Sequence, residues 1–73
     1  MRYIVLTAKL DGGARDPAFF HDAEVTLCKD AAAVQKVLRR KGQDWLLFEA
    51  VGGKAEPRSV CFEPDGKTIR SIQ

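Results

Sequence analysis

The segment from Trp45 to Val51 is the most continuously apolar part of this chain, and Glu49 is its one charged residue. Such a run is typical of a strand that is covered on both faces, whereas a half-exposed strand alternates apolar and polar residues. The glycine pair Gly52-Gly53 follows the run and ends it. Something must therefore pack against each side of this strand, and that requirement constrains the whole fold.

Only residues 30–41 predict a helix. Asp30 is a suitable N-cap, because its carboxylate can accept a bond from a free backbone N–H of the first turn. Val34, Val37 and Leu38 recur at the spacing of one helical face. Gly42 is placed to follow the last turn as a C′ residue. The residues expected to point away from the apolar face are Gln35, Lys36 and Arg39.

The remaining apolar segments predict strands at 2–10, 23–29, 45–51, 58–63 and 67–72. A tight turn is expected at 63–66, where the sequence is Glu-Pro-Asp-Gly. Seventy-three residues leave room for one core only. We therefore expect a single α+β domain over 1–73. Its order is β-β-α-β-β-β, with one helix packed on one face of a mostly antiparallel sheet.

One helix covers one sheet face, yet the strands at 2–10 and 45–51 are apolar on both faces. If Ile4, Leu6 and Ala8 face the helix, an apolar surface lies on the other side. The residues predicted to form this surface and bind a partner are Tyr3, Val5, Trp45 and Leu47, with Phe19 and Phe20 at its margin. If the 45–51 strand has the opposite parity, Leu46 and Phe48 replace Trp45 and Leu47.

Two arrangements would cover such a surface. The 11–22 loop could fold back and place Phe19 and Phe20 on it, or the face could pack against another protein or a second copy of this chain. A core of this size rarely supplies more than roughly 3–5 kcal/mol, which favours a homodimer. The sequence therefore predicts a small non-enzymatic binding module that acts through protein–protein association.

A basic cluster near the end of the helix suggests an alternative. Residues 29–41 hold five basic residues and one acid, although the whole chain has a net charge of only +2. The cluster could hold nucleic-acid phosphates, but the helix carries no aromatic residues for base stacking. Basic residues also suit the last turn of any helix, because they interact favourably with its dipole. The candidate nucleic-acid contacts are Lys36, Arg39, Arg40 and Lys41.

The residue types that carry most catalysis are scarce. His21 is the single histidine, and Cys28 and Cys61 are the only thiols, without the spacing of a metal-binding pair. We therefore predict no catalytic residues, no metal, no cofactor and no enzymatic activity. The chain also lacks an apolar stretch of about 20 residues that could span a bilayer. A cytoplasmic protein with free thiols and no membrane contact is expected.

Overall fold

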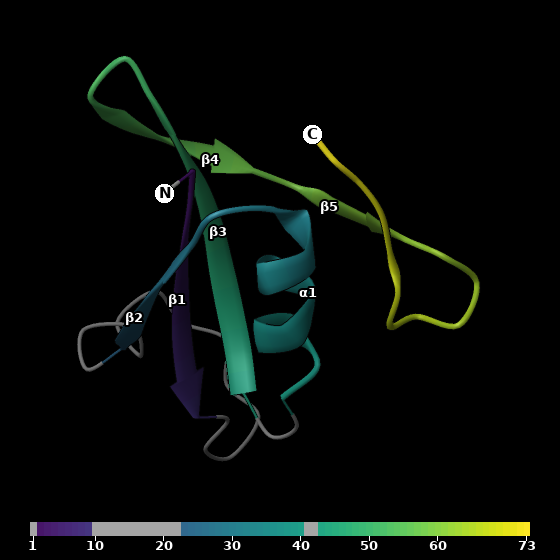
Figure 1. Cartoon of the computed structure of the whole chain (residues 1–73). Coiled ribbons are helices and arrows are strands. Elements are labelled where there is room, and N and C mark those ends of the chain that lie inside the picture. The colour runs from purple at the N-terminus through teal and green to yellow at the C-terminus, as the bar shows by residue number, and fades with distance from the viewer. Residues whose placement is uncertain (1, 10–22, 41–42) are drawn as a thin grey trace.

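A computed structural model describes residues 2–9, 23–40 and 43–73. Helix α1 accompanies two antiparallel sheets of four strands and two strands, so the predicted α+β class is confirmed (Figure 1). The predicted order of elements is also found, with one additional strand. The bounds are β1 Tyr3–Lys9, β2 Glu24–Cys28, α1 Ala31–Leu38, β3 Gln43–Val51, β4 Lys54–Arg58, β5 Val60–Phe62 and β6 Ile69–Ile72.

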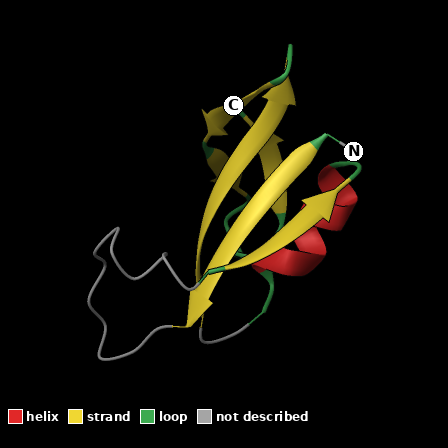
Figure 2. Cartoon of the chain, turned by 90° about the vertical axis from the view of Figure 1, so that its left-hand side faces the viewer, coloured by secondary structure: helices red, strands yellow, loops and turns green. Residues whose placement is uncertain are grey.

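The larger sheet has the strand order β2-β1-β3-β4. Both β2 and β3 pair with β1 in antiparallel fashion, so they run parallel to each other on its two sides. The segment that connects them carries α1 and crosses β1 on one face of the sheet (Figures 1 and 2). The helix therefore covers one face, as the sequence predicts.

Local signals position α1. The Asp30 carboxylate accepts a hydrogen bond from the backbone N–H of Ala33 at 2.9 Å, which confirms the predicted N-cap. Val34 and Val37 are buried, and Leu38 packs partly buried against the same core. The helix is shorter than predicted, because its last residue is Leu38 and Arg39 is the C-cap. The prediction of Gly42 as C′ is therefore wrong, and Gly42 itself lies outside the described residues.

The residues that β1 and β3 contribute to the core under the helix all have odd numbers. Tyr3, Val5 and Leu47 are buried together with Cys28, Val34 and Val37. The prediction that Tyr3, Val5 and Leu47 lie on the uncovered face is therefore wrong. Both strands are apolar on both sides, so hydrophobicity alone did not distinguish their two possible orientations.

Strand β4 was not predicted. It follows a two-residue turn at Gly52 and Gly53, whose φ angles of 56° and 78° are the positive values required by a type I′ hairpin. The strand reads Lys-Ala-Glu-Pro-Arg and forms an edge of the sheet. Charged residues and proline are poor signals for a strand, but they protect an exposed edge from pairing with other chains.

The β5–β6 hairpin packs on the helix side of the molecule through Val60, Ile69 and Ile72. The predicted turn before β6 is confirmed, because the N–H of Gly66 donates to the carbonyl of Glu63 at 2.9 Å. Hydrogen bonds in both directions between Ser59 and Gln73 close the other end of the hairpin. Helix and hairpin together therefore pack against one side of the large sheet.

Candidate functional site

The side of the large sheet away from α1 is a continuous apolar surface. Adjacent residues of a strand point to opposite faces. The buried residues of β1 under the helix all have odd numbers, so their even-numbered neighbours point to the other side of the sheet. The register places Leu27, Ile4, Phe48 and Pro57 in one row across the four strands. A second row joins Val25, Leu6 and Leu46 across three strands. We call these seven residues the open face: Ile4, Leu6, Val25, Leu27, Leu46, Phe48 and Pro57.

Large side chains of the open face are accessible to solvent. Leu27 is 61% exposed, Val25 is 58% exposed and Leu46 is 42% exposed, while Ile4, Leu6 and Phe48 are half-buried. Ala8, Ala50 and Ala55 extend the same surface. Figure 2 shows this side of the sheet, with the helix behind it. No described element lies across it.

Charge is distributed very unequally between the two sides of the sheet. Asp44 is the only charged residue of the described strands that shares the parity of the open face, and its carboxylate accepts from the N–H of Trp45 at 2.9 Å. Glu49, Glu56 and Arg58 lie on the helix side, because they share the parity of Leu47. The open face is therefore apolar and nearly uncharged.

The charges on the helix side form a network around Glu49. Its carboxylate accepts from Nε of Arg2 at 2.6 Å and from Nε of Arg58 at 2.9 Å, and Arg58 also contacts Glu56 at 3.3 Å. The hydrogen bond from Arg2, and then that from Arg58, lower the pKa of Glu49. The Arg2 guanidinium lies 5.3 Å from the centre of the Tyr3 ring. These polar groups are thus paired with one another, away from the open face.

Four of the six residues that the sequence grouped as a partner-binding site lie together on the helix side of the sheet, not on its uncovered face. Tyr3, Val5 and Leu47 are in the core, and Phe19 and Phe20 lie outside the described residues. Trp45 is half-buried on the helix side. The alternative parity, with Leu46 and Phe48 on the uncovered side, is the one observed. Sequence reasoning missed Ile4, Leu6, Val25 and Leu27, which it assigned to the covered side or left unplaced.

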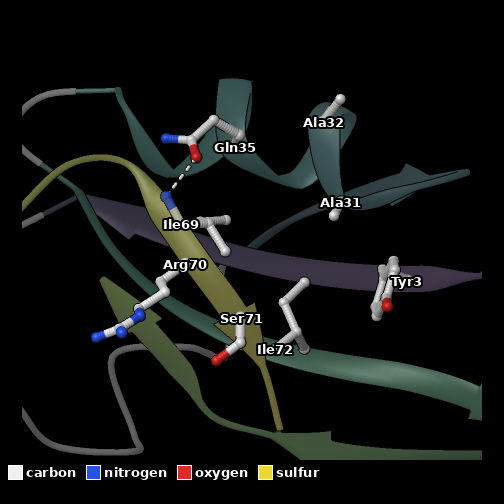
Figure 3. Close-up of a pocket in the computed structure, with 8 residues that line it drawn as sticks. All are labelled: Tyr3, Ala31, Ala32, Gln35, Ile69, Arg70, Ser71 and Ile72. Carbon is white, nitrogen blue, oxygen red and sulfur yellow. Dashed lines mark hydrogen bonds between the residues drawn. The ribbon is translucent and has the colours of Figure 1, made fainter. Parts of the chain in front are cut away.

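A cavity of about 420 Å³ lies between α1 and β6 (Figure 3). Gln35, which was expected to point away from the core, reaches across its rim. Its side-chain amide accepts from the N–H of Ile69 and donates to the carbonyl of Lys67, each at 2.5 Å. The prediction that Gln35 points away from the core is therefore wrong. The β5–β6 hairpin lies beside the helix, so the Gln35 side chain can bond to the backbone of Lys67 and Ile69.

A second cavity, of about 570 Å³, lies near the C-terminal end of α1. Its lining residues are Leu38, Arg39, Trp45, Phe62, Gly66 and Lys67. The Trp45 and Phe62 rings meet edge to face, with centres 6.3 Å apart and planes at 76°. Sequence reasoning missed this site, because the residues come from four separate segments.

The basic cluster is exposed as far as it is described. Lys36, Arg39 and Arg40 are all accessible to solvent, and Lys41 lies outside the described residues. Binding of nucleic acid by these side chains stays a prediction. The aromatic rings absent from the helix itself are present next to Arg39, in the second cavity.

The thiols differ in their surroundings. Cys28 is 2% exposed at the end of β2, whereas Cys61 is exposed in β5. Burial, and then the negative charge of Asp30, raise the pKa of the Cys28 thiol, which makes it a poorer nucleophile. His21 lies outside the described residues. Within residues 2–9, 23–40 and 43–73, no group of three His, Cys, Asp or Glu side chains is placed to hold a metal ion.

The described part of the chain contains no helix long and apolar enough to cross a membrane. No protein-family model matches the sequence, and no match was found among curated proteins or among solved structures.

Proposed function

We propose that this chain is a non-enzymatic association module that forms a homodimer by packing its open face against the open face of a second copy. The observation that carries the proposal is the unequal covering of the large sheet. Helix and hairpin cover one side, while Val25, Leu27 and Leu46 remain exposed on the other. A contiguous exposed apolar patch on a small protein commonly marks an interaction site.

The charge distribution supports a second copy as the partner. A twofold interface places the same patch on both subunits, so any charge in the patch is present twice in the interface, and a charge close to the axis meets its own copy. The open face avoids this repulsion, because Asp44 is the only charged residue of its parity in the described strands. A partner with a charged binding surface would find no complementary charge here.

Sheet-on-sheet packing gives the dimer a familiar geometry. Two antiparallel sheets pack face to face at about 10 Å when their inner faces are apolar, as in β-sandwiches. The rows through Ile4 and Leu6 supply such a face, with large side chains on three of the four strands. In this dimer each sheet would be covered on both sides. That arrangement would also explain why β3 is apolar on both of its faces.

Charge insertion at Leu46 tests the proposal. Leu46→Lys places a cation in the open face and, through the twofold symmetry, two cations in the interface. We expect the dimer dissociation constant from sedimentation equilibrium to rise at least about tenfold, since like charges in an interface cost several kcal/mol.

Val51→Lys is the matched control. Val51 lies in the same strand and is 41% exposed, almost the same as Leu46 at 42%, but it has the parity of the helix side. Its substitution should leave the dissociation constant within about twofold of that of the wild type. Far-UV circular dichroism establishes that both variants fold. Unchanged dimerisation of folded Leu46→Lys would contradict the proposal.

A further inference from the structure

The second cavity combines an aromatic wall with a cationic rim. Leu38, Trp45 and Phe62 form the wall, and all three are half-buried. Arg39 and Lys67 lie at the rim with exposed side chains. At about 570 Å³ the cavity falls within the range of roughly 300–1,000 Å³ that is typical of small-molecule sites.

The turn that borders the cavity leaves it accessible. Gly66 adopts a φ of 71°, and a Cβ placed there would have no other atom within 4 Å, so this edge faces open space. The neighbouring Asp65 carboxylate accepts from the N–H groups of Lys67 and Thr68 and from the Thr68 hydroxyl, at 2.6–2.8 Å. Its oxygens are thus engaged by the turn, and its negative charge also interacts with Arg39. Among the described residues, no hydrogen bond occupies the side-chain nitrogens of Arg39 and Lys67.

We infer that this cavity binds a planar aromatic ring bearing an anionic group, of the kind formed by a nucleobase and its phosphate. The ring would pack against Trp45 and Phe62, since stacking on aromatic side chains is the usual way in which proteins hold an unpaired base. The anion would lie between Arg39, whose guanidinium matches phosphate geometry, and Lys67. The lining itself contains no acidic residue, and the adjacent Asp65 carboxylate, which interacts with Arg39, is the nearest negative charge along the turn.

This site is independent of the proposed dimer. Trp45 has the parity of Leu47 and thus lies on the helix side of the sheet. The open face can therefore be covered without blocking the cavity. Failure of either proposal leaves the other intact.

Trp45 is the only tryptophan of the chain, so its fluorescence reports directly on the cavity. We propose titration with AMP, with adenosine, with inorganic phosphate and with a short single-stranded oligodeoxyadenylate, at an excitation wavelength that adenine does not absorb. AMP should change the Trp45 emission saturably. Adenosine and phosphate, which each lack one half of the ligand, should bind at least about fivefold more weakly.

The oligonucleotide arm distinguishes the two sources of the same chemistry. Binding of the strand at least about tenfold tighter than that of AMP identifies a nucleic-acid strand as the ligand, and equal or weaker binding identifies a free nucleotide. No saturable response to either AMP or the oligonucleotide overturns the inference, as does adenosine binding as tightly as AMP.

Paired variants test the rim. Arg39→Gln/Lys67→Gln should weaken AMP binding at least about fivefold, because it removes both cations while retaining the aromatic wall. Lys54→Gln/Arg70→Gln removes the same total charge at exposed positions that do not line the cavity and should leave the affinity unchanged. Equal losses of AMP affinity in the two double variants would show that only the net charge of the protein matters. That result would overturn the proposal that Arg39 and Lys67 bind the anion.

Discussion

Adjacent side chains of β1 have opposite surroundings although their chemistry is similar. Val5 is fully buried beneath α1, whereas Ile4 lies on the open face beside Leu27 and Phe48. The alternation of faces could be predicted from the sequence, because a strand requires it. The sequence could not predict whether the odd-numbered or the even-numbered residues face the helix, since either group supplies enough apolar surface for a core. The placement of Tyr3 and Val5 was therefore wrong by one residue, which in a strand reverses every side chain.

Thr7 is the polar exception in the core. It is 3% exposed, and its hydroxyl oxygen has no hydrogen-bond partner within the described part of the chain. Burial of an unpaired hydroxyl is unfavourable, so Thr7→Val, which replaces it with a methyl group of similar size, should stabilise the fold by about 1 kcal/mol. Urea denaturation at a fixed protein concentration measures this change.

Thr26→Val is a suitable comparison for Thr7→Val. Thr26 is half-buried and lies next to Val5 in the adjacent strand, on the same face of the sheet. Its substitution should change the free energy of unfolding less than Thr7→Val does. Destabilisation by Thr7→Val would show that the Thr7 hydroxyl is paired in the folded protein.

Asp65 gives the fold a specific dependence on acid. Hydrogen bonds from the Thr68 hydroxyl, and then from the backbone N–H groups of Thr68 and Lys67, lower its pKa from 3.8 to about 2. A carboxylate with a lowered pKa in the folded state stabilises the fold above its ordinary pKa, and this contribution is lost as the pH falls through the lowered value. Asp65→Asn removes the ionisable group but keeps an oxygen acceptor.

Thermal unfolding followed from neutral pH to pH about 2 tests this role of Asp65. The wild type should be more stable than Asp65→Asn above pH about 4, and the two melting temperatures should converge as the pH falls toward 2. Glu49 also has a lowered pKa, but it is present in both proteins, so its contribution cancels in the difference. A difference that stays constant over this range would contradict the assignment.

At the scale of elements, features set by a few neighbouring residues could be predicted from the sequence, whereas contacts between distant segments could not. The N-cap at Asp30, the Val34 face and the turn at Gly66 were all correct, because each depends on a few neighbouring residues. Strand β4 escaped prediction because an edge strand needs little apolar character. The contact of Gln35 with β6, and the meeting of Trp45 and Phe62, depend on tertiary packing that no local pattern describes.

Gln35 joins the helix to the hairpin, so its removal should weaken that contact. Gln35→Ala loses the bonds to the backbone at Lys67 and Ile69, and we expect it to lower the free energy of unfolding by about 1–2 kcal/mol. Amide hydrogen exchange at Ile69 should become faster. Lys36→Ala, at the next and exposed position, should cost less than about 0.5 kcal/mol. Equal effects of the two substitutions would show that the Gln35 contacts contribute nothing.

At the scale of the molecule, the described part of the chain is asymmetric about its large sheet. Helix, hairpin and the Glu49 charge network all lie on one side, and the open face lies on the other. The sequence predicted this surplus of apolar surface, because one helix cannot cover two faces. It did not predict that the surplus surface contains Ile4, Leu6, Val25 and Leu27, and it gave Leu46 and Phe48 only as the alternative parity of the 45–51 strand. Nor could it predict that the cavity lined by Trp45 and Phe62 lies on the helix side of the sheet, opposite the proposed dimer contact.

The molar mass of the wild-type protein in solution tests the central claim most directly. Light scattering coupled to size-exclusion chromatography, over a series of loading concentrations, should give twice the 8.1 kDa of one chain and decline toward the single-chain mass only on dilution. A mass of 8.1 kDa at every concentration, up to the limit of solubility, would contradict the dimer.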